Sequence, residues 1–172
     1  MASEEHDNPR LVELLPNSDR RDTPEFSGQL MGIGKSSLLT ESTVGLIASR
    51  KCPGRAFVEM LDRVPRWVEE NRILLSGFHS PLEKQVLHSL LRRKGRIVKV
   101  LARGINTYRA SDDERLALEE GRLLVLTSFP PQVRRTTRAT ALERNRLIVA
   151  LATELVVPHV SEGSPLAEII AE

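Results

Sequence analysis

Short runs of consecutive apolar residues recur along the chain from residue 43 onward. They are TVGLIAS (43–49), RILLSG (72–77), RIVKVLA (96–102), RLLVLTSF (122–129) and ELVVPHV (154–160). Runs that are apolar on consecutive positions are typical of strands buried on both faces. Between them, helix-like stretches lie at 56–71, 80–95, near 112–121, before 152 and at 164–172. This alternation predicts an α/β fold: a doubly wound, three-layer, mainly parallel Rossmann-like sheet of about five strands.

Residues 1–25 differ from the rest of the chain. They hold seven acidic and three basic residues, a net charge of −4, together with three prolines. Such a composition predicts a disordered acidic arm. Residues 26–172 carry the remaining net charge of +6 and have the length of a single ordinary domain.

Composition excludes several classes of function. No apolar run is long enough to span a bilayer, and the acidic start MASEEHDNPR has no hydrophobic segment behind it. We therefore expect a cytoplasmic location and no membrane partner. The single cysteine, Cys52, excludes internal disulfides and a multi-cysteine zinc site. No cluster of His, Cys and Asp completes another site, so we expect no metal and no cofactor.

The segment MGIGKSSLL (31–39) is similar to a phosphate-binding P-loop, but the pattern is incomplete. The motif needs a glycine where this chain has Gln29, and it needs a buried strand before the loop. The preceding DRRDTPEFSGQ is too polar for such a strand. We interpret the segment as a polar turn before a short apolar segment, Leu38 and Leu39.

Ligands of a doubly wound sheet bind beyond the carboxyl ends of its strands, so the loops there form the candidate site. Ser80-Pro81-Leu82-Glu83 is a capping box with proline at the first helical position. A helix that starts directly after a strand offers backbone donors and a positive dipole end to an anion. His79 and Glu83 also lie close enough in sequence for an acid/base pair. The alternative is a well-capped helix with no further role.

Three other segments have similar chemistry. SRKCPG (49–54) places two cations beside a helix start, and its cysteine fits a packed turn residue better than a nucleophile. SEGSP (161–165) repeats the capping serine and the proline. PQVRRTTRATALERNR (131–146) holds five arginines, which suit phosphate-bearing partners, although a solvated helix face has the same composition. The chain has only six aromatic residues, which leaves little material for stacking on bases.

Taken together, these segments resemble the Rossmann-like core of the DNA-processing protein A (DprA, Smf) family. The resemblance runs from about residue 43 to 166 and rests on GLIASRKCPG (45–54), ILLSG (73–77) and LERNRLIVALATELVVPHVSEGS (142–164). RNRLIVALA (144–152) is its most specific part. After Gly77 the chain departs from the family, because FHSPLEKQVLH replaces the family's alanine-arginine-glycine-isoleucine-aspartate run. An ARGIN sequence follows the third strand instead, where the family has a glycine-rich turn.

The resemblance implies a short, divergent domain of the SLOG superfamily that binds a nucleotide or single-stranded DNA and forms a homodimer. Matched by position, it implies pocket residues Ser49, Arg50, Gly77, Arg144, Asn145, Arg146, Gly163 and Ser164. The loops themselves add Lys51, His79 and Ser80.

Whether the chain is an enzyme is left open by the sequence. The superfamily also includes cytokinin-activating phosphoribohydrolases, which use a Pro-Gly-Gly loop and a glutamate at the start of a helix. Glu83 is the possible catalytic counterpart, but no Pro-Gly-Gly turn occurs. The leading hypothesis is a binding module. The alternatives are a nucleotide N-glycosidic hydrolase that uses Glu83, and a partner-docking protein that uses its acidic arm.

Overall fold

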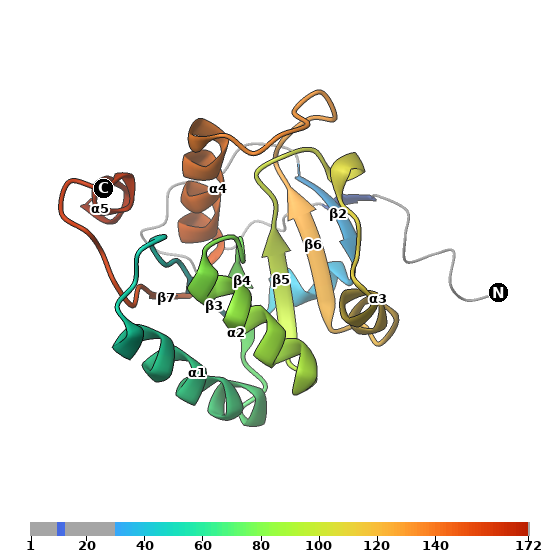
Figure 1. Cartoon of the computed structure of the whole chain (residues 1–172). Coiled ribbons are helices and arrows are strands. Elements are labelled where there is room, and N and C mark those ends of the chain that lie inside the picture. The colour runs from blue at the N-terminus through green and yellow to red at the C-terminus, as the bar shows by residue number, and fades with distance from the viewer. Residues whose placement is uncertain (1–9, 13–29, 172) are drawn as a thin grey trace.

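The computed structural model describes residues 10–12 and 30–171 and contains one seven-stranded sheet (Figure 1). The strand order is β1-β2-β6-β5-β4-β3-β7. Five neighbouring strands are parallel: β3 (Thr43–Leu46), β4 (Ile73–Ser76), β5 (Arg96–Val100), β6 (Leu123–Thr127) and β7 (Glu154–Val156). Each lies in one of the five apolar runs, so the predicted doubly wound α/β fold is confirmed.

Two strands that the sequence analysis did not predict extend the sheet beyond β6. These are β1 (Arg10–Val12) and β2 (Leu30–Gly34), and both pair antiparallel. The interpretation of MGIG as a polar turn was therefore wrong. The 3-10 helix η1 (Ser36–Thr40) then buries Leu38 and Leu39. Because β2 runs antiparallel to β6, the loop after β2 lies at the opposite edge from the carboxyl ends of the parallel strands, and no phosphate loop forms there.

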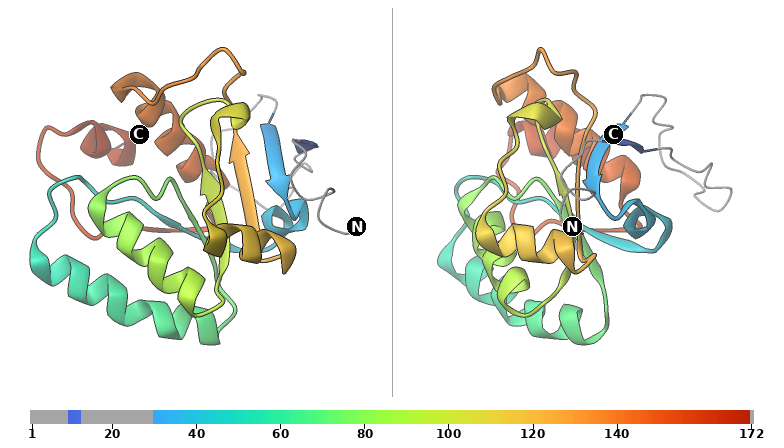
Figure 2. Two further views of the ribbon diagram at one scale, coloured as in Figure 1. Left: turned by 45° about the vertical axis from the view of Figure 1, so that its right-hand side comes forward. Right: turned by 90° about the vertical axis from the view of Figure 1, so that its right-hand side faces the viewer.

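Helices cover both faces of the sheet, as the two views of Figure 2 show. The elements are α1 (Gly54–Glu69), α2 (Pro81–Arg92), η2 (Ile105–Thr107), α3 (Asp112–Glu119), α4 (Arg138–Leu151) and α5 (Pro165–Ala171). The apolar side chains of α1, α2 and α3 form one core with one face of the sheet. Those of η1, α4 and α5 form a second core on the other face. The three-layer architecture is thus confirmed.

The long helix α1 runs without a break through Pro65. Proline removes one helical hydrogen bond and is expected to break or kink a helix. Pro65 is exposed, whereas its neighbours Val64 and Trp67 are buried against the sheet. Packing on the buried side therefore holds the helix together across the missing bond.

The carboxyl end of α4 is fixed against β3, and this contact sets the direction of the helix. A side chain at Gly45 would place its Cβ 2.7 Å from Cβ of Ala152, so helix and strand approach as closely as a glycine permits. The hydroxyl of Thr43 donates to the carbonyl oxygen of Leu151 at 3.3 Å. Since its last residues lie at the start of β3, α4 directs its N-terminus toward the carboxyl edge of the sheet.

Replacement of Gly45 by alanine is expected to lower the free energy of unfolding by about 1–3 kcal/mol, the usual cost of overpacking a filled core. Urea unfolding measures this difference. Gly54→Ala is the matched control, because a Cβ at Gly54 meets nothing within 4 Å. Equal effects of the two substitutions would show that α4 and β3 are not in close contact.

Candidate functional site

A pocket of about 670 Å³ lies at the carboxyl ends of β3 and β4, between α4 and the loops that follow these strands. The strand order reverses here: β4, β5 and β6 lie on one side of β3, whereas β7 lies on the other. This is where a doubly wound sheet holds its ligand. The pocket is lined by Ile47, Ala48, Ser49, Arg50, His79, Ser80, Glu83, Thr136, Thr137, Arg138, Ala141, Leu142, Arg144, Asn145, Ser164 and Leu166.

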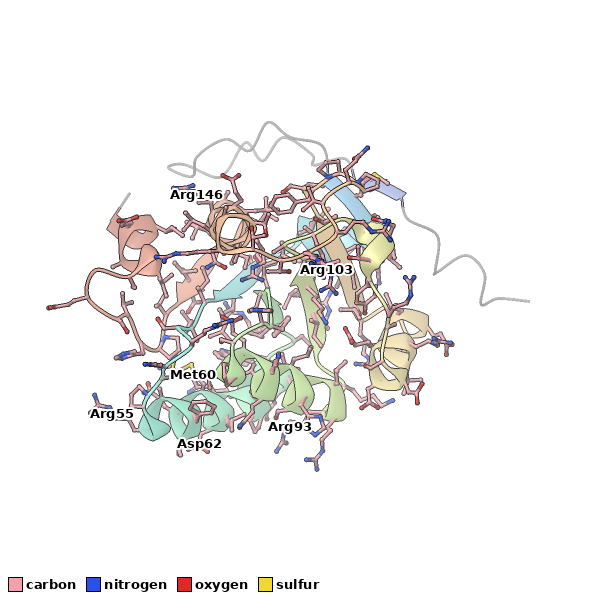
Figure 3. The ribbon with its side chains drawn as sticks, turned by 45° about the horizontal axis from the view of Figure 1, so that its top comes forward. Arg55, Met60, Asp62, Arg93, Arg103 and Arg146 are labelled. Atoms are coloured by element: carbon pink, nitrogen blue, oxygen red, sulfur yellow. The ribbon has the colours of Figure 1, made fainter. Side chains whose placement is uncertain are left out.

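Most of the residues expected from the sequence meet in this pocket. Ser49, Arg50, His79, Ser80, Glu83, Arg144, Asn145 and Ser164 all line it. Gly77, Lys51, Gly163 and Arg146 do not. Arg146 lies on the side of α4 that faces away from α2 (Figure 3), 3.7 Å from Glu143. Two of the arginines that the resemblance implies therefore have different surroundings: Arg144 points into the fold, and Arg146 is exposed.

Arg144 is a buried cation with unused hydrogen-bond donors. Its exposed fraction is 6%, and its only hydrogen bond among the described residues runs from Nε to Oδ1 of Asn145 at 3.3 Å. Burial lowers the pKa of the guanidinium from its ordinary value, although nearby Glu83 raises it, and an arginine stays charged in proteins. A buried charge without partners is costly. The open pocket beside Arg144 is therefore suited to an anion that would accept from its terminal nitrogens.

Gly77 is not a lining residue, but it makes the position of Arg144 possible. A Cβ at this position would lie 2.6 Å from Cζ and 2.6 Å from Nε of Arg144, so the guanidinium lies directly against the Gly77 backbone. The next residue, Phe78, has a φ of 48° and an exposed fraction of 4%. Aromatic residues rarely adopt this left-handed conformation. The turn sends the Phe78 ring into the core and leaves the space above Gly77 to Arg144.

Glu83 joins the two loops that form one wall of the pocket. Its exposed fraction is 4%, and Oε2 accepts from the Ala48 N–H at 2.8 Å. Oε1 accepts from the N–H groups of His79 at 2.9 Å and Ser80 at 3.4 Å. The Ser80 hydroxyl in turn accepts from the Glu83 N–H, which completes the predicted capping box. Both carboxylate oxygens are thus engaged by the backbone, and the bond to Ala48 is a structural role that the sequence did not indicate.

The charges around His79 make the pocket mouth electropositive. Partial burial lowers the pKa of His79 from its ordinary value, and Arg144, Lys84 and Arg50 lower it further, against an opposing effect of Glu83. Cys52, in contrast, has its thiol pKa raised by burial and by Glu83, and its Sγ donates to the Ser49 carbonyl at 3.2 Å. This geometry fits the packed turn residue expected from the sequence.

The sequence analysis singled out the arginine-rich segment 131–146 but did not indicate which residues at the start of α4 form a wall of the pocket. Thr136, Thr137, Arg138, Ala141 and Leu142 all line the pocket. The hydroxyl of Thr137 caps α4 by accepting from the Thr140 N–H at 3.2 Å. The signal was present, because a threonine precedes the helix, but the third helical position holds threonine in place of the usual Glu or Gln.

The described part of the chain contains no candidate metal site and no candidate membrane span. Among residues 10–12 and 30–171, no group of three or more His, Cys, Asp and Glu side chains could hold a metal ion. No helix in these ranges is long and apolar enough to cross a membrane.

The fold and the pocket define a Rossmann-like α/β domain with a cationic pocket at its switch in strand order. A model of the family described as DNA recombination-mediator protein A matches residues 13–165, and the chain belongs to this family. A comparison with curated proteins finds no match.

The solved structures that are similar to this chain include two DNA processing proteins. DNA processing protein A (DprA) from Streptococcus pneumoniae has 20% identity and a TM-score of 0.65, and the match covers 83% of this chain and 52% of that one. The protein from Helicobacter pylori, described for its single-stranded DNA binding mode, has 16% identity and a TM-score of 0.71, with 97% and 76% covered. This chain thus spans about half the length of the pneumococcal protein, and the likeness concerns the fold.

The close approach of Gly77 and Arg144 predicts coupling between the two positions. Gly77→Ala alone is expected to cost only about 1 kcal/mol of unfolding free energy, because the new methyl group displaces the end of a flexible side chain that borders the open pocket. In an Arg144→Ala background the same substitution is expected to cost less than about 0.5 kcal/mol, since the clash is gone. Urea unfolding of the four proteins gives the coupling energy, and additive effects would contradict the close approach.

His79 is expected to titrate below its ordinary pKa of 6.5. The folded chain disfavours the imidazolium, so this residue reduces stability as the pH falls through the ordinary histidine range. NMR titration of the imidazole measures the midpoint. Arg144→Ala is expected to raise it, because a neighbouring cation is removed, whereas Arg146→Ala leaves it unchanged. If Arg144→Ala did not change the titration midpoint of His79, the two residues would not interact electrostatically.

Proposed function

We propose that this chain binds the phosphate groups of single-stranded DNA or of a nucleotide in the pocket at the end of β3 and β4, as a module for DNA processing. The observation that carries this proposal is Arg144, a buried cation whose terminal nitrogens have no partner among the described residues and which lines the pocket. Arginine donors recognise phosphate through charge-assisted hydrogen bonds. The exposed Arg50 and Arg138 add two further cations at the rim.

Single-stranded DNA is the ligand we favour over a mononucleotide. The segment between β6 and α4 projects beyond the carboxyl edge of the sheet (Figure 1), and Arg134 and Arg135 on it are exposed. Together with Arg138 they continue the positive charge outside the pocket, where only a ligand with several phosphates would reach. The similarity to the Helicobacter pylori protein supports the same ligand.

Binding is expected to depend on phosphates more than on bases. None of the described residues that line the pocket is Phe, Tyr or Trp, and His79 is the one ring among them, so base stacking contributes little. Interactions with phosphate carry no sequence information and weaken with salt. The predicted module is therefore salt-sensitive and tolerant of sequence.

The geometry of Glu83 supports a binding module over the hydrolase alternative. A general acid must reach the leaving group with a free carboxyl oxygen. Both oxygens of Glu83 accept backbone hydrogen bonds in the resting pocket. A homodimer remains part of the proposal, on the ground of the family resemblance.

Arg144→Ala is expected to weaken binding of a fluorescent single-stranded oligonucleotide about 10- to 100-fold, the value of one or two charge-assisted hydrogen bonds. The slope of log affinity against log salt should become shallower by about 0.7 for each phosphate that the variant no longer neutralises. Fluorescence anisotropy at several salt concentrations measures both quantities.

Arg146→Ala is the matched control, since it removes the same charge from the exposed side of α4 and should change affinity less than about threefold. Unlabelled mononucleotides serve as competitors. Equal reductions for the two variants would place the binding surface outside the pocket. Full displacement by a mononucleotide would assign the pocket to small nucleotides.

A further inference from the structure

Three backbone N–H groups from two loops converge on one point beside the pocket. Ala48 belongs to the loop after β3, whereas His79 and Ser80 belong to the loop after β4. Their nitrogen atoms lie 2.8, 2.9 and 3.4 Å from the two oxygens of Glu83. The point lies directly in front of the N-terminus of α2, a helix of 12 residues.

Such a group of converging donors at a helix N-terminus is an anion-binding nest. In this chain the anion in the nest is the buried carboxylate of Glu83 itself. Two further positions of the first turn offer no free donor: the Glu83 N–H donates to Ser80 Oγ at 3.4 Å, and Pro81 has no N–H.

We propose that Glu83 is a resident anion that closes this nest to ligand phosphate and so directs the phosphate to the guanidinium of Arg144, which lies against Gly77 in the same loop, and to the start of α4. This inference rests on the proposed function, because it names which donors of the same pocket hold the phosphate. It replaces the expectation from the sequence that the start of α2 is itself the phosphate site. Glu83 is then a specificity-determining residue that a ligand does not need to touch.

The charges of the pocket agree with this division. The lining residues include three arginines and one glutamate, a formal net charge of +2, and the negative charge is held at the α2 wall. A phosphate at the nest would meet a carboxylate and three N–H groups that already donate to it. At the guanidinium of Arg144 it would meet terminal nitrogens without a partner among the described residues, with the exposed Arg138 also lining the pocket. Electrostatic repulsion and donor supply therefore both favour Arg144 over the nest.

An amide side chain cannot replace Glu83 in this role. The two carboxylate oxygens accept from donors in both loops, and a glutamine would turn its amide N–H₂ toward one of these N–H groups. Alanine removes the anion and leaves the three donors unpaired around an empty space. Glu83→Ala is therefore the variant in which the nest becomes available to an external anion.

The test titrates inorganic phosphate into the whole chain. Binding is detected from the NMR signals of the backbone amides and of the arginine side chains. In the wild type, phosphate is expected to shift Nε of Arg144 and the amide of Arg138, while the amides of Ala48 and His79 stay unchanged. Larger shifts at Ala48 and His79 than at Arg144 would overturn the inference but leave phosphate binding in the pocket. No shift at any lining residue would overturn the proposed function and the inference with it.

The second arm compares Arg144→Ala with the double variant Glu83→Ala/Arg144→Ala. Phosphate should leave the Tm of the single variant unchanged and raise that of the double variant by at least about 2 °C. It should also shift the Ala48 and His79 amides of the double variant. If circular dichroism shows that the double variant is folded, and phosphate changes neither its Tm nor its amide signals, then Glu83 only connects the two loops and the inference is wrong. If the double variant does not fold, the wild-type titration decides.

Discussion

The carboxyl edge of the sheet depends on one buried carboxylate. Glu83 lies in the first turn of α2 and binds the N–H of Ala48, 35 residues earlier in the chain. Without this bond, the loops after β3 and β4 would each have to satisfy their buried donors separately, at a cost of about 1–3 kcal/mol for each donor left unpaired. The bond therefore fixes two loops relative to one another, and these loops form one wall of the pocket.

A second capping-box glutamate, Glu114, also joins separate segments, on the other half of the sheet. Glu114 completes the capping box of α3 with Ser111, and its Oε2 accepts from Lys99 Nζ at 2.9 Å and from the Tyr108 hydroxyl at 2.8 Å. Burial opposes the ionised form, yet Lys99, Tyr108 and Ser111 hold the Glu114 pKa below its ordinary value. The difference is that Glu114 has a cationic partner on β5, whereas Glu83 is held by backbone donors. The pocket cation, Arg144, thereby keeps its terminal nitrogens available.

The sequence predicted those features that local patterns determine. Five apolar runs are long enough to mark the parallel strands, and the order Ser-Pro-Leu-Glu marks the start of α2. It failed where an interaction joins distant segments. The segment MGIG contains two glycines and does not have the pattern of a strand. Strand β2 is specified instead by its pairing with β6, far later in the chain. Likewise, nothing near Gly77 in the sequence shows that Arg144 fills the space of its missing side chain.

This dependence on distant segments explains why the candidate site was only half predicted. The loops after β3 and β4 have motifs of their own, whereas the first turns of α4 enter the pocket because the other end of that helix is fixed at Gly45 and Thr43. A helix held at one end directs every residue of its first turns together. Arg144 lies three, four and seven positions before the buried Leu147, Ile148 and Leu151 and so shares their core-facing side of α4, whereas Arg146 is rotated away from Arg144 by two residues, about 200°. The choice between two arginines that look equivalent in the sequence is thus made by the helical period and by one glycine in β3.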